Sequence, residues 1–372
     1  MSLQIPAISL YSAGMRTVCW LVFLLWASSF SASQERTPSG GSEISHLQSL
    51  AEADDLPAQV ALARAYLDGN GITQSDALAL KWLRRAAAEN YSDAENELGI
   101  LYSSGRGVEK NKEEAFKWYK KAAKHGSPSG MFNLGVCYYN GDGVNIDDAL
   151  AFAWFTLAKE HGSAPAVDAV ARSNKELRPR TLIEGLRDIG EFYERGESLP
   201  RNVPEAVKWY SNAAEHGDTE SQVRLAAIYM GTGIAADYTQ ARHWCEVGAK
   251  GGDSRAQYCL GTLYQRGLAV QQDPKRALRY YQQASNSGNT FAMRALAEMC
   301  VTGEAGKVDR LAAFLLYVRA GAKGDKDAIP GAAKLQKELD PGERKKADKQ
   351  LPQWRIDPRK LETILSNPNS LQ

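Results

Sequence analysis

A motif of about 36 residues repeats seven times along this chain and constrains the fold more than any other feature. Its register is marked by Tyr66, Tyr102, Tyr138, Tyr193, Tyr229 and Tyr264, with Cys300 in the seventh repeat. Glycine follows three residues later in six of the seven repeats, and a large aromatic residue follows about sixteen residues later in most of them. Repeats of this length are typical of solenoids rather than of a single globular core.

The spacing of apolar residues within each repeat predicts two helices. Ala94, Leu98 and Tyr102 lie four residues apart and therefore share one helical face. Gly105 supplies the backbone freedom that ends this first helix, and Gly126 fits the left-handed position that closes the second. A single helical hairpin cannot bury its apolar face alone, so neighbouring hairpins must stack. The sequence predicts an all-α fold, an α/α superhelical solenoid of about seven helix-turn-helix repeats.

The segment AENELGILYSSGRGVEKNKEEAFKWYKKAAKHG resembles the Sel-one-like repeat, a relative of the tetratricopeptide repeat. The resemblance covers residues 55–324 and departs from the family pattern at Asn90, in a shortened fifth loop and at Leu316. It implies a right-handed superhelix that serves as a scaffold or adaptor for other proteins.

A second duplication predicts two blocks. The motif Lys-Glu-Leu-x-Pro follows Gly162 and recurs after Gly324, which places Pro179 and Pro341 where new helices begin. We expect a first block over 55–187, with three repeats and capping helices, and a second over 188–350, with four repeats and capping helices. The superhelix should bend at 163–187. Residues 34–54 are predicted to be a flexible linker, and 351–372 a tail with a possible short helix.

The first 33 residues are predicted to be a signal peptide. Arg16 precedes an apolar run from Val18 to Ala27, and small residues follow. The run is too short to span a bilayer, which makes an uncleaved anchor the lesser alternative, and the true start lies at Met1 or Met15. We expect an exported protein, periplasmic or secreted, with the endoplasmic reticulum lumen as the alternative.

The cysteines and histidines are the candidate reactive groups of the chain. Four cysteines follow the signal segment, and an oxidising compartment would permit disulfides between them. Each lies within a helical pattern that also suits a small buried residue, so free thiols are the expectation for Cys137, Cys245, Cys259 and Cys300. Three histidines precede a closing glycine, where they favour a helix C-terminus, and these are His125, His161 and His216.

No motif in the sequence predicts catalysis. Neither a metal-ligand cluster nor a nucleophile motif occurs, so we expect no enzyme activity, cofactor or metal. The net charge of +1 disfavours nucleic-acid binding. We expect a scaffold that binds a protein or peptide in a concave groove, the alternative being a cell-envelope enzyme such as a hydrolase of cell-wall material. The first helices of the repeats should line the groove through Asn96, Phe132, Tyr139, Asn140, Arg187, Glu191, Tyr258, Gln265, Arg266, Arg294 and Glu298.

Overall fold

The computed structural model describes residues 40–304 and 306–354, and within them it contains helices and no strands. Each repeat is a hairpin of a helix A and a helix B. The A helices are α3 (Leu56–Asp68), α5 (Ser92–Ser104), α7 (Pro128–Asn140), α10 (Pro179–Arg195), α12 (Thr219–Tyr229), α14 (Ser254–Arg266) and α16 (Thr290–Thr302). The B helices are α4 (Asp76–Ala88), α6 (Lys112–Lys124), α8 (Asp148–Glu160), α11 (Val203–Glu215), α13 (Tyr238–Lys250), α15 (Pro274–Asn286) and α17 (Arg310–Ala322).

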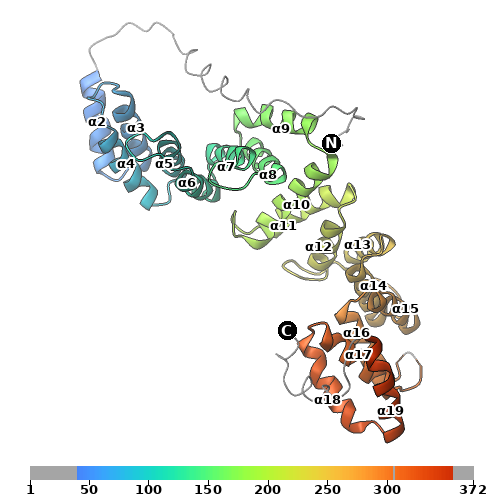
Figure 1. Ribbon diagram of the computed structural model, residues 1–372. Coiled ribbons are helices and arrows are strands. Elements are labelled where there is room, and N and C mark those ends of the chain that lie inside the picture. The colour runs from blue at the N-terminus through green and yellow to red at the C-terminus, as the bar shows by residue number, and fades with distance from the viewer. Residues whose placement is uncertain (1–39, 305, 355–372) are drawn as a thin grey trace.

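The hairpins follow one another in an elongated array from α2 (Gly40–Glu52) to α19 (Pro341–Gln350) (Figure 1). The remaining elements are the inserted helix α9 (Ala164–Glu176), the short turn η1 (Lys326–Ala328), α18 (Ile329–Glu338) and η2 (Leu351–Trp354). This arrangement confirms the predicted solenoid. Each helix packs mainly on its neighbours along the chain, as expected for a quasi-one-dimensional fold.

Two local signals fix the turn between helices A and B. Helix A usually ends at a left-handed glycine, such as Gly105 with φ of 79°. Helix B begins after a capping side chain, such as Asn111, which accepts a hydrogen bond from the backbone N–H of Glu114. The backbone N–H of Asn111 also donates to the carbonyl of Tyr102 at 2.9 Å, and every repeat has the equivalent bond. In repeat 5 helix α12 ends two residues early, which accounts for its 35-residue spacing.

A close contact between glycine and a ring holds the two helices of most hairpins together. A Cβ added at Gly261 would lie 2.4 Å from the ring of Tyr281, so only glycine lets α14 and α15 approach this closely. Gly99 with Tyr119 and Gly190 with Tyr210 repeat this arrangement. The tryptophans of helix B are largely buried, Trp154 being 2% exposed and Trp209 5%. These contacts confirm that the repeated aromatic residues pack the core.

The segment between repeats 3 and 4 contains the expected extra helix. Helix α9 packs on α8, and α10 packs on α8 as the other A helices pack on the preceding helix B. Residues 151–158 of α8 are therefore all buried. One hydrophobic cluster contains Trp154, Ile189 and Trp209, so the core continues across the predicted boundary at residues 187 and 188. The array turns at α9 and α10 (Figure 1).

Two predictions differ from the structure. The segment predicted as a linker over 34–54 forms helix α2 at Gly40–Glu52, whose Leu47 and Ala51 join the first hydrophobic cluster. Its apolar residues Ile44, Leu47 and Ala51 are spaced to share one helical face, but this signal is short and lies within a segment rich in glycine and serine. The prediction of free thiols is wrong for Cys245 and Cys259, which form a disulfide between α13 and α14. Cys137 and Cys300 are free.

The predicted signal segment, residues 34–39 and most of the predicted tail lie outside the described residues. Within the described part of the chain, no helix combines the length and apolar character needed to cross a bilayer. Helix α19 begins at Pro341 after a capping box between Asp340 and Glu343, as the proline spacing predicted.

A buried carboxylate in α10 yields a test of pH dependence. Burial raises the pKa of Asp188 to about 6, although the guanidinium of Arg187 partly opposes this shift. The folded state therefore disfavours the charged form, and this penalty is absent below the unfolded pKa and complete above pH 6. We expect Asp188→Asn to raise the free energy of unfolding by about 2 kcal/mol at pH 8. Urea unfolding should show that this gain disappears at pH 4.

The matched control for this measurement is Asp168→Asn, which alters an exposed carboxylate on the neighbouring helix α9. We expect it to leave the free energy of unfolding nearly unchanged at both pH values. An equal gain from Asp188→Asn at pH 4 and pH 8 would contradict the proposed cause.

Candidate partner-binding surface

Two pairs of A helices from successive repeats contact each other directly. Helices α5 and α7 touch, as do α12 and α14, whereas no two B helices of the described chain make a contact of comparable extent. The A helices therefore lie closer together than the B helices, which places them on the inner side of the curved array. This is the side on which the sequence analysis placed the partner-binding residues.

Several of those predicted residues hold neighbouring repeats together. Arg187 donates to Asp218 of the next A helix at 3.2 Å, and Arg294 donates to Asp327 at 2.8 Å. Asn96 is only 6% exposed and accepts a hydrogen bond from Asn133 at 2.8 Å. These three side chains occupy the same position in their repeats, six residues before the register residue. That position serves mainly as a contact between repeats.

The inserted segment covers the inner side at repeat 3. Phe132 and Tyr139 pack partly buried in a cluster that includes Leu182 and Leu186 of α10 and Ala169 of α9. Asn140, at the end of the same helix, is exposed and donates to Asp142. The inner side is therefore interrupted here, and Phe132 and Tyr139 do not line an open groove.

Charged side chains on the inner side of repeats 4 to 6 largely pair with one another. Arg255 of α14 donates to Glu220 of α12 at 2.8 Å and to Asp253 at 2.9 Å. Arg224 lies 3.2 Å from Glu220 and 4.0 Å from Glu194 of α10. The predicted residue Glu191 pairs within its own helix with Arg195 at 2.8 Å. Few charged side chains on the inner side of repeats 4 to 6 therefore remain available to bind a ligand.

A row of aromatic rings with one exposed end lies farther along, on α14 to α16. Phe291 is 54% exposed, and its ring centroid lies 5.9 Å from that of Tyr258, which lies 5.7 Å from that of Tyr281. The guanidinium of Arg294 covers the Phe291 ring at 5.6 Å. We call Phe291, Tyr258 and Tyr281 the aromatic row. It runs from the solvent into the core, so a partner side chain that docks on it meets a rigid apolar base.

Polar groups border the aromatic row. The Tyr281 hydroxyl donates to the side-chain carbonyl of Gln265 at 2.9 Å, and the Gln265 amide donates to Glu304 at 2.8 Å. Burial raises the pKa of Tyr281 to about 12, which keeps its hydroxyl protonated as a donor. Arg266 and Glu298 are exposed on the same two A helices. An apolar centre with a polar border is the usual anatomy of a protein interface.

The sequence analysis named Tyr258 and Arg294 but missed Phe291, the residue that brings them together. A signal for it existed. Phe291 stands nine residues before the register residue, where the other repeats from the second onward carry Asp93, Ser129, Glu184, Glu220 and Arg255. A large apolar side chain at an otherwise polar position of the repeat is the signal that the sequence offered.

Within the described residues, no group of three or more histidine, cysteine or acidic side chains is placed to hold a metal ion. The three repeated histidines lie at the C-terminal ends of B helices, as expected. The ring nitrogens of His161 and His216 contact their own helices' carbonyls, Leu157 at 2.9 Å and Asn212 at 2.8 Å.

The geometry defines an α/α-hairpin solenoid with an exposed aromatic contact surface. The Sel1 repeat pattern matches residues 56–91, 92–127, 128–163, 183–218, 219–253, 254–289 and 290–325. The chain belongs to the Sel1 repeat family, since these matches cover more than half of it.

Known proteins share this repeat. Over 99 residues the chain is 33% identical to an uncharacterized protein of Neisseria meningitidis, which covers 26% of the chain and 21% of that protein. It is 34% identical over 95 residues to an ERAD-associated E3 ubiquitin-protein ligase component of Arabidopsis thaliana, which covers 25% of the chain and 15% of that protein. The matches thus span about a fifth or less of these relatives' own length.

A solved structure of c5321, a protective antigen of uropathogenic Escherichia coli with an SLR fold, is 31% identical to the chain. The alignment covers 84% of this chain and 71% of that one, with a TM-score of 0.43. A further relative is a chitin synthase regulatory factor of Schizosaccharomyces pombe, which is 29% identical over 31% of this chain and 13% of that protein.

Proposed function

We propose that this chain is an exported scaffold that binds a protein or peptide on its inner side, with the aromatic row as the main contact. The observation that carries the proposal is the exposure of Phe291, whose ring is 54% accessible yet held by Tyr258 and Arg294. Rigid aromatic side chains dominate binding energy at protein interfaces, because they bury a large area at little cost in conformational entropy.

The aromatic row is the most available binding site because other parts of the inner side are already covered or paired. The inserted segment covers repeat 3, and Arg224, Glu220 and Arg255 of α12 and the start of α14 pair among themselves. Repeats 6 and 7 offer both exposed apolar area and free polar groups, such as Arg266 and Glu298. A scaffold role also accords with its relatives, which include a chitin synthase regulatory factor and a component of an E3 ubiquitin-protein ligase.

Two features support export. The N-terminal sequence has the basic residue, apolar run and small residues of a signal peptide. The Cys245–Cys259 disulfide suits an oxidising compartment, such as the periplasm or the endoplasmic reticulum lumen, since cytosolic thiols are kept reduced. Both features support a location outside the cytosol.

Site-specific photocrosslinking tests whether a partner binds at the aromatic row. We expect a benzophenone amino acid at position 291 to give a discrete adduct in cells, and Tyr258→Ala to lower its yield at least about tenfold by removing the supporting ring. The adduct would be detected by immunoblot and identified by mass spectrometry. Arg294 is unsuitable for this test because it bonds Asp327, so its replacement would also loosen the last repeat.

The control places the same photoreactive group at Ile146, which is 46% exposed on the turn between α7 and α8. Ile146 is an exposed apolar residue like Phe291, but it does not lie on the inner side. We therefore expect no discrete adduct at this position. Equal adduct yields at positions 291 and 146 would show that crosslinking depends on exposure alone. That result would argue against partner binding at the aromatic row.

A further inference from the structure

Five cations without an ion-pair partner in the described chain project from the B helices of the first two repeats. Lys81 and Arg84 project from α4, and Lys120, Lys121 and Lys124 project from the last two turns of α6. All five are exposed, and none of them makes an ion pair within the described chain. We call these five residues the basic face. It lies on the B-helix side, away from the aromatic row.

Charge is separated between the two helices of repeat 2. Helix α5 carries Asp93, Glu95 and Glu97 and no basic residue. Helix α6 has its acidic residues in the first turn, where Glu114 pairs with Lys117, so its C-terminal half is purely cationic. In the next B helix the positions of Lys120 and Lys121 are taken by Thr156 and Leu157. The basic face is therefore a bounded patch on a chain whose net charge is only +1.

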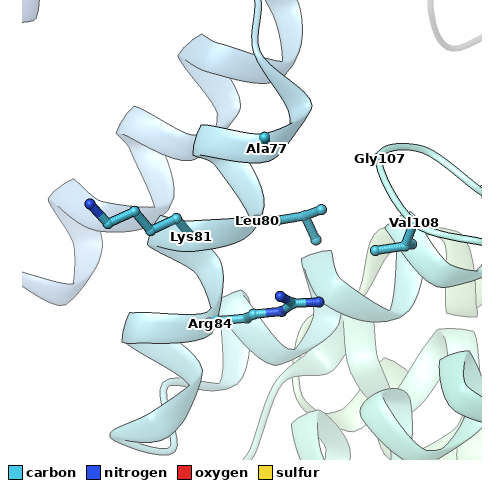
Figure 2. A pocket seen from close by; sticks show the side chains of 6 residues that line it. All are labelled: Ala77, Leu80, Lys81, Arg84, Gly107 and Val108. Atoms are coloured by element: carbon cyan, nitrogen blue, oxygen red, sulfur yellow. The ribbon is translucent and has the colours of Figure 1, made fainter.

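A surface depression adjoins the basic face. It has a volume of about 410 Å3 and lies between α4 and the turn before α6. Leu80 and Arg84 extend from α4 toward the turn that carries Gly107 and Val108, whereas Lys81 extends to the other side of the helix (Figure 2). The lining thus combines aliphatic side chains with an unpaired guanidinium.

A second depression lies between α13 and the turn before α15, and its cations differ in their ion pairing from those beside the first depression. It has a volume of about 400 Å3 and is lined by Arg242 and Arg276. There each arginine pairs with an acid of its own helix or cap, Arg242 with Glu246 at 2.8 Å and Arg276 with Asp273 at 3.4 Å. The arginines that line this depression are neutralised, whereas Lys81 and Arg84, which line the depression of repeats 1 and 2, pair with no acid of the described chain.

We propose that the basic face binds an acidic peptide segment that places an aliphatic side chain in the depression beside Leu80 and Val108. Unpaired cations attract carboxylates and raise the association rate of an acidic partner. A planar bilayer cannot enter a depression between a helix and a turn. A glycan would need an accessible aromatic ring, whereas Trp82 is only 8% exposed and the half-buried Trp118 has the ammonium of Lys121 4.2 Å from its ring centroid. This would be a second binding site, separate from the aromatic row.

Fluorescence anisotropy of the full mature chain with a labelled probe tests this inference. The probe is a short fluorescein-labelled peptide of glutamate and aspartate with one central leucine. We expect saturable binding that weakens as NaCl rises from about 50 mM to about 500 mM. Lys81→Glu/Arg84→Glu is expected to weaken binding at least about tenfold. Replacing the leucine of the probe by serine is expected to weaken it severalfold.

The control is Lys275→Glu/Arg279→Glu on the outer side of α15, which changes the net charge of the chain by the same amount. We expect it to leave probe binding nearly unchanged. Equal losses from both double variants would overturn the proposal, because they would show non-specific attraction. It would also be overturned if the serine probe bound as well as the leucine probe, or if vesicles of phosphatidylglycerol competed better than unlabelled peptide.

Discussion

Replacing both Cys245 and Cys259 by alanine is expected to lower the free energy of unfolding by about 3 kcal/mol, measured by urea denaturation. The disulfide joins cysteines 14 residues apart in sequence and links helix B of repeat 5 to helix A of repeat 6. Closing a loop of this size removes that much chain entropy from the unfolded state. In a solenoid the loss should act locally, on the contact between these two repeats.

Repeat 5 depends on this link because it lacks the packing found in its neighbours. Cys245 stands where Tyr210 and Tyr281 stand in repeats 4 and 6, and Ala226 stands where those repeats have Gly190 and Gly261. The contact between glycine and ring is therefore missing within its hairpin. We expect unfolding of the double variant to separate into two transitions, with the break between α13 and α14.

A reducing agent supplies the control for this prediction. Dithiothreitol is expected to shift the unfolding midpoint of the native chain toward that of the alanine variant and to leave the variant itself unchanged. If the native midpoint did not respond to dithiothreitol, the disulfide would not contribute to stability as argued.

Much of the fold could be predicted from the sequence because the same physical signals recur in every repeat. A residue such as Asn111 caps helix B, Gly105 ends helix A, and Ala94 packs against the neighbouring helices. Each signal is local, so the periodicity alone reveals it. Helix α2 carries only a short apolar period, Ile44, Leu47 and Ala51, and it lies outside the repeat, so the recurring motif does not reveal it.

The candidate site was predicted less completely because it depends on contacts between repeats. The pairing of Arg187 with Asp218 spans 31 residues, and that of Arg294 with Asp325 spans the same distance. Periodicity places such residues on a helix face but does not say whether a neighbour already binds them. The disulfide was missed for a similar reason, since only the stacking of α13 on α14 brings Cys245 and Cys259 within 6.0 Å at Cα.

The largest effect of a single substitution is expected from His125→Ala, which should lower the free energy of unfolding by about 3 kcal/mol. The side chain of Glu95 is only 1% exposed, and its carboxylate lies 2.7 Å from Nδ1 of His125. His125 is the partner that balances this buried acid. Its removal would leave the carboxylate without a hydrogen-bond donor in a low-dielectric site, which is among the costliest changes in a core.

Repeats 3 and 4 contain matched controls. His161 and His216 occupy the same position as His125, but they contact only carbonyls of their own helices. Met131 and Leu186 stand where repeat 2 has Glu95, so no buried acid depends on these histidines. We expect His161→Ala and His216→Ala each to cost less than about 1 kcal/mol, measured by the same urea titration.

A compensating change separates the loss of the pair from any general effect of losing the ring. In repeats 1 and 5 the position of Glu95 is occupied by Gln59 and Gln222, whose amides donate to the backbone carbonyls of Ala51 and Ala214 at the end of the preceding helix. Glu95→Gln should form the same bond and needs no histidine. The double variant His125→Ala/Glu95→Gln is therefore expected to recover most of the stability lost in His125→Ala, and a purely additive result would refute the role assigned to the pair.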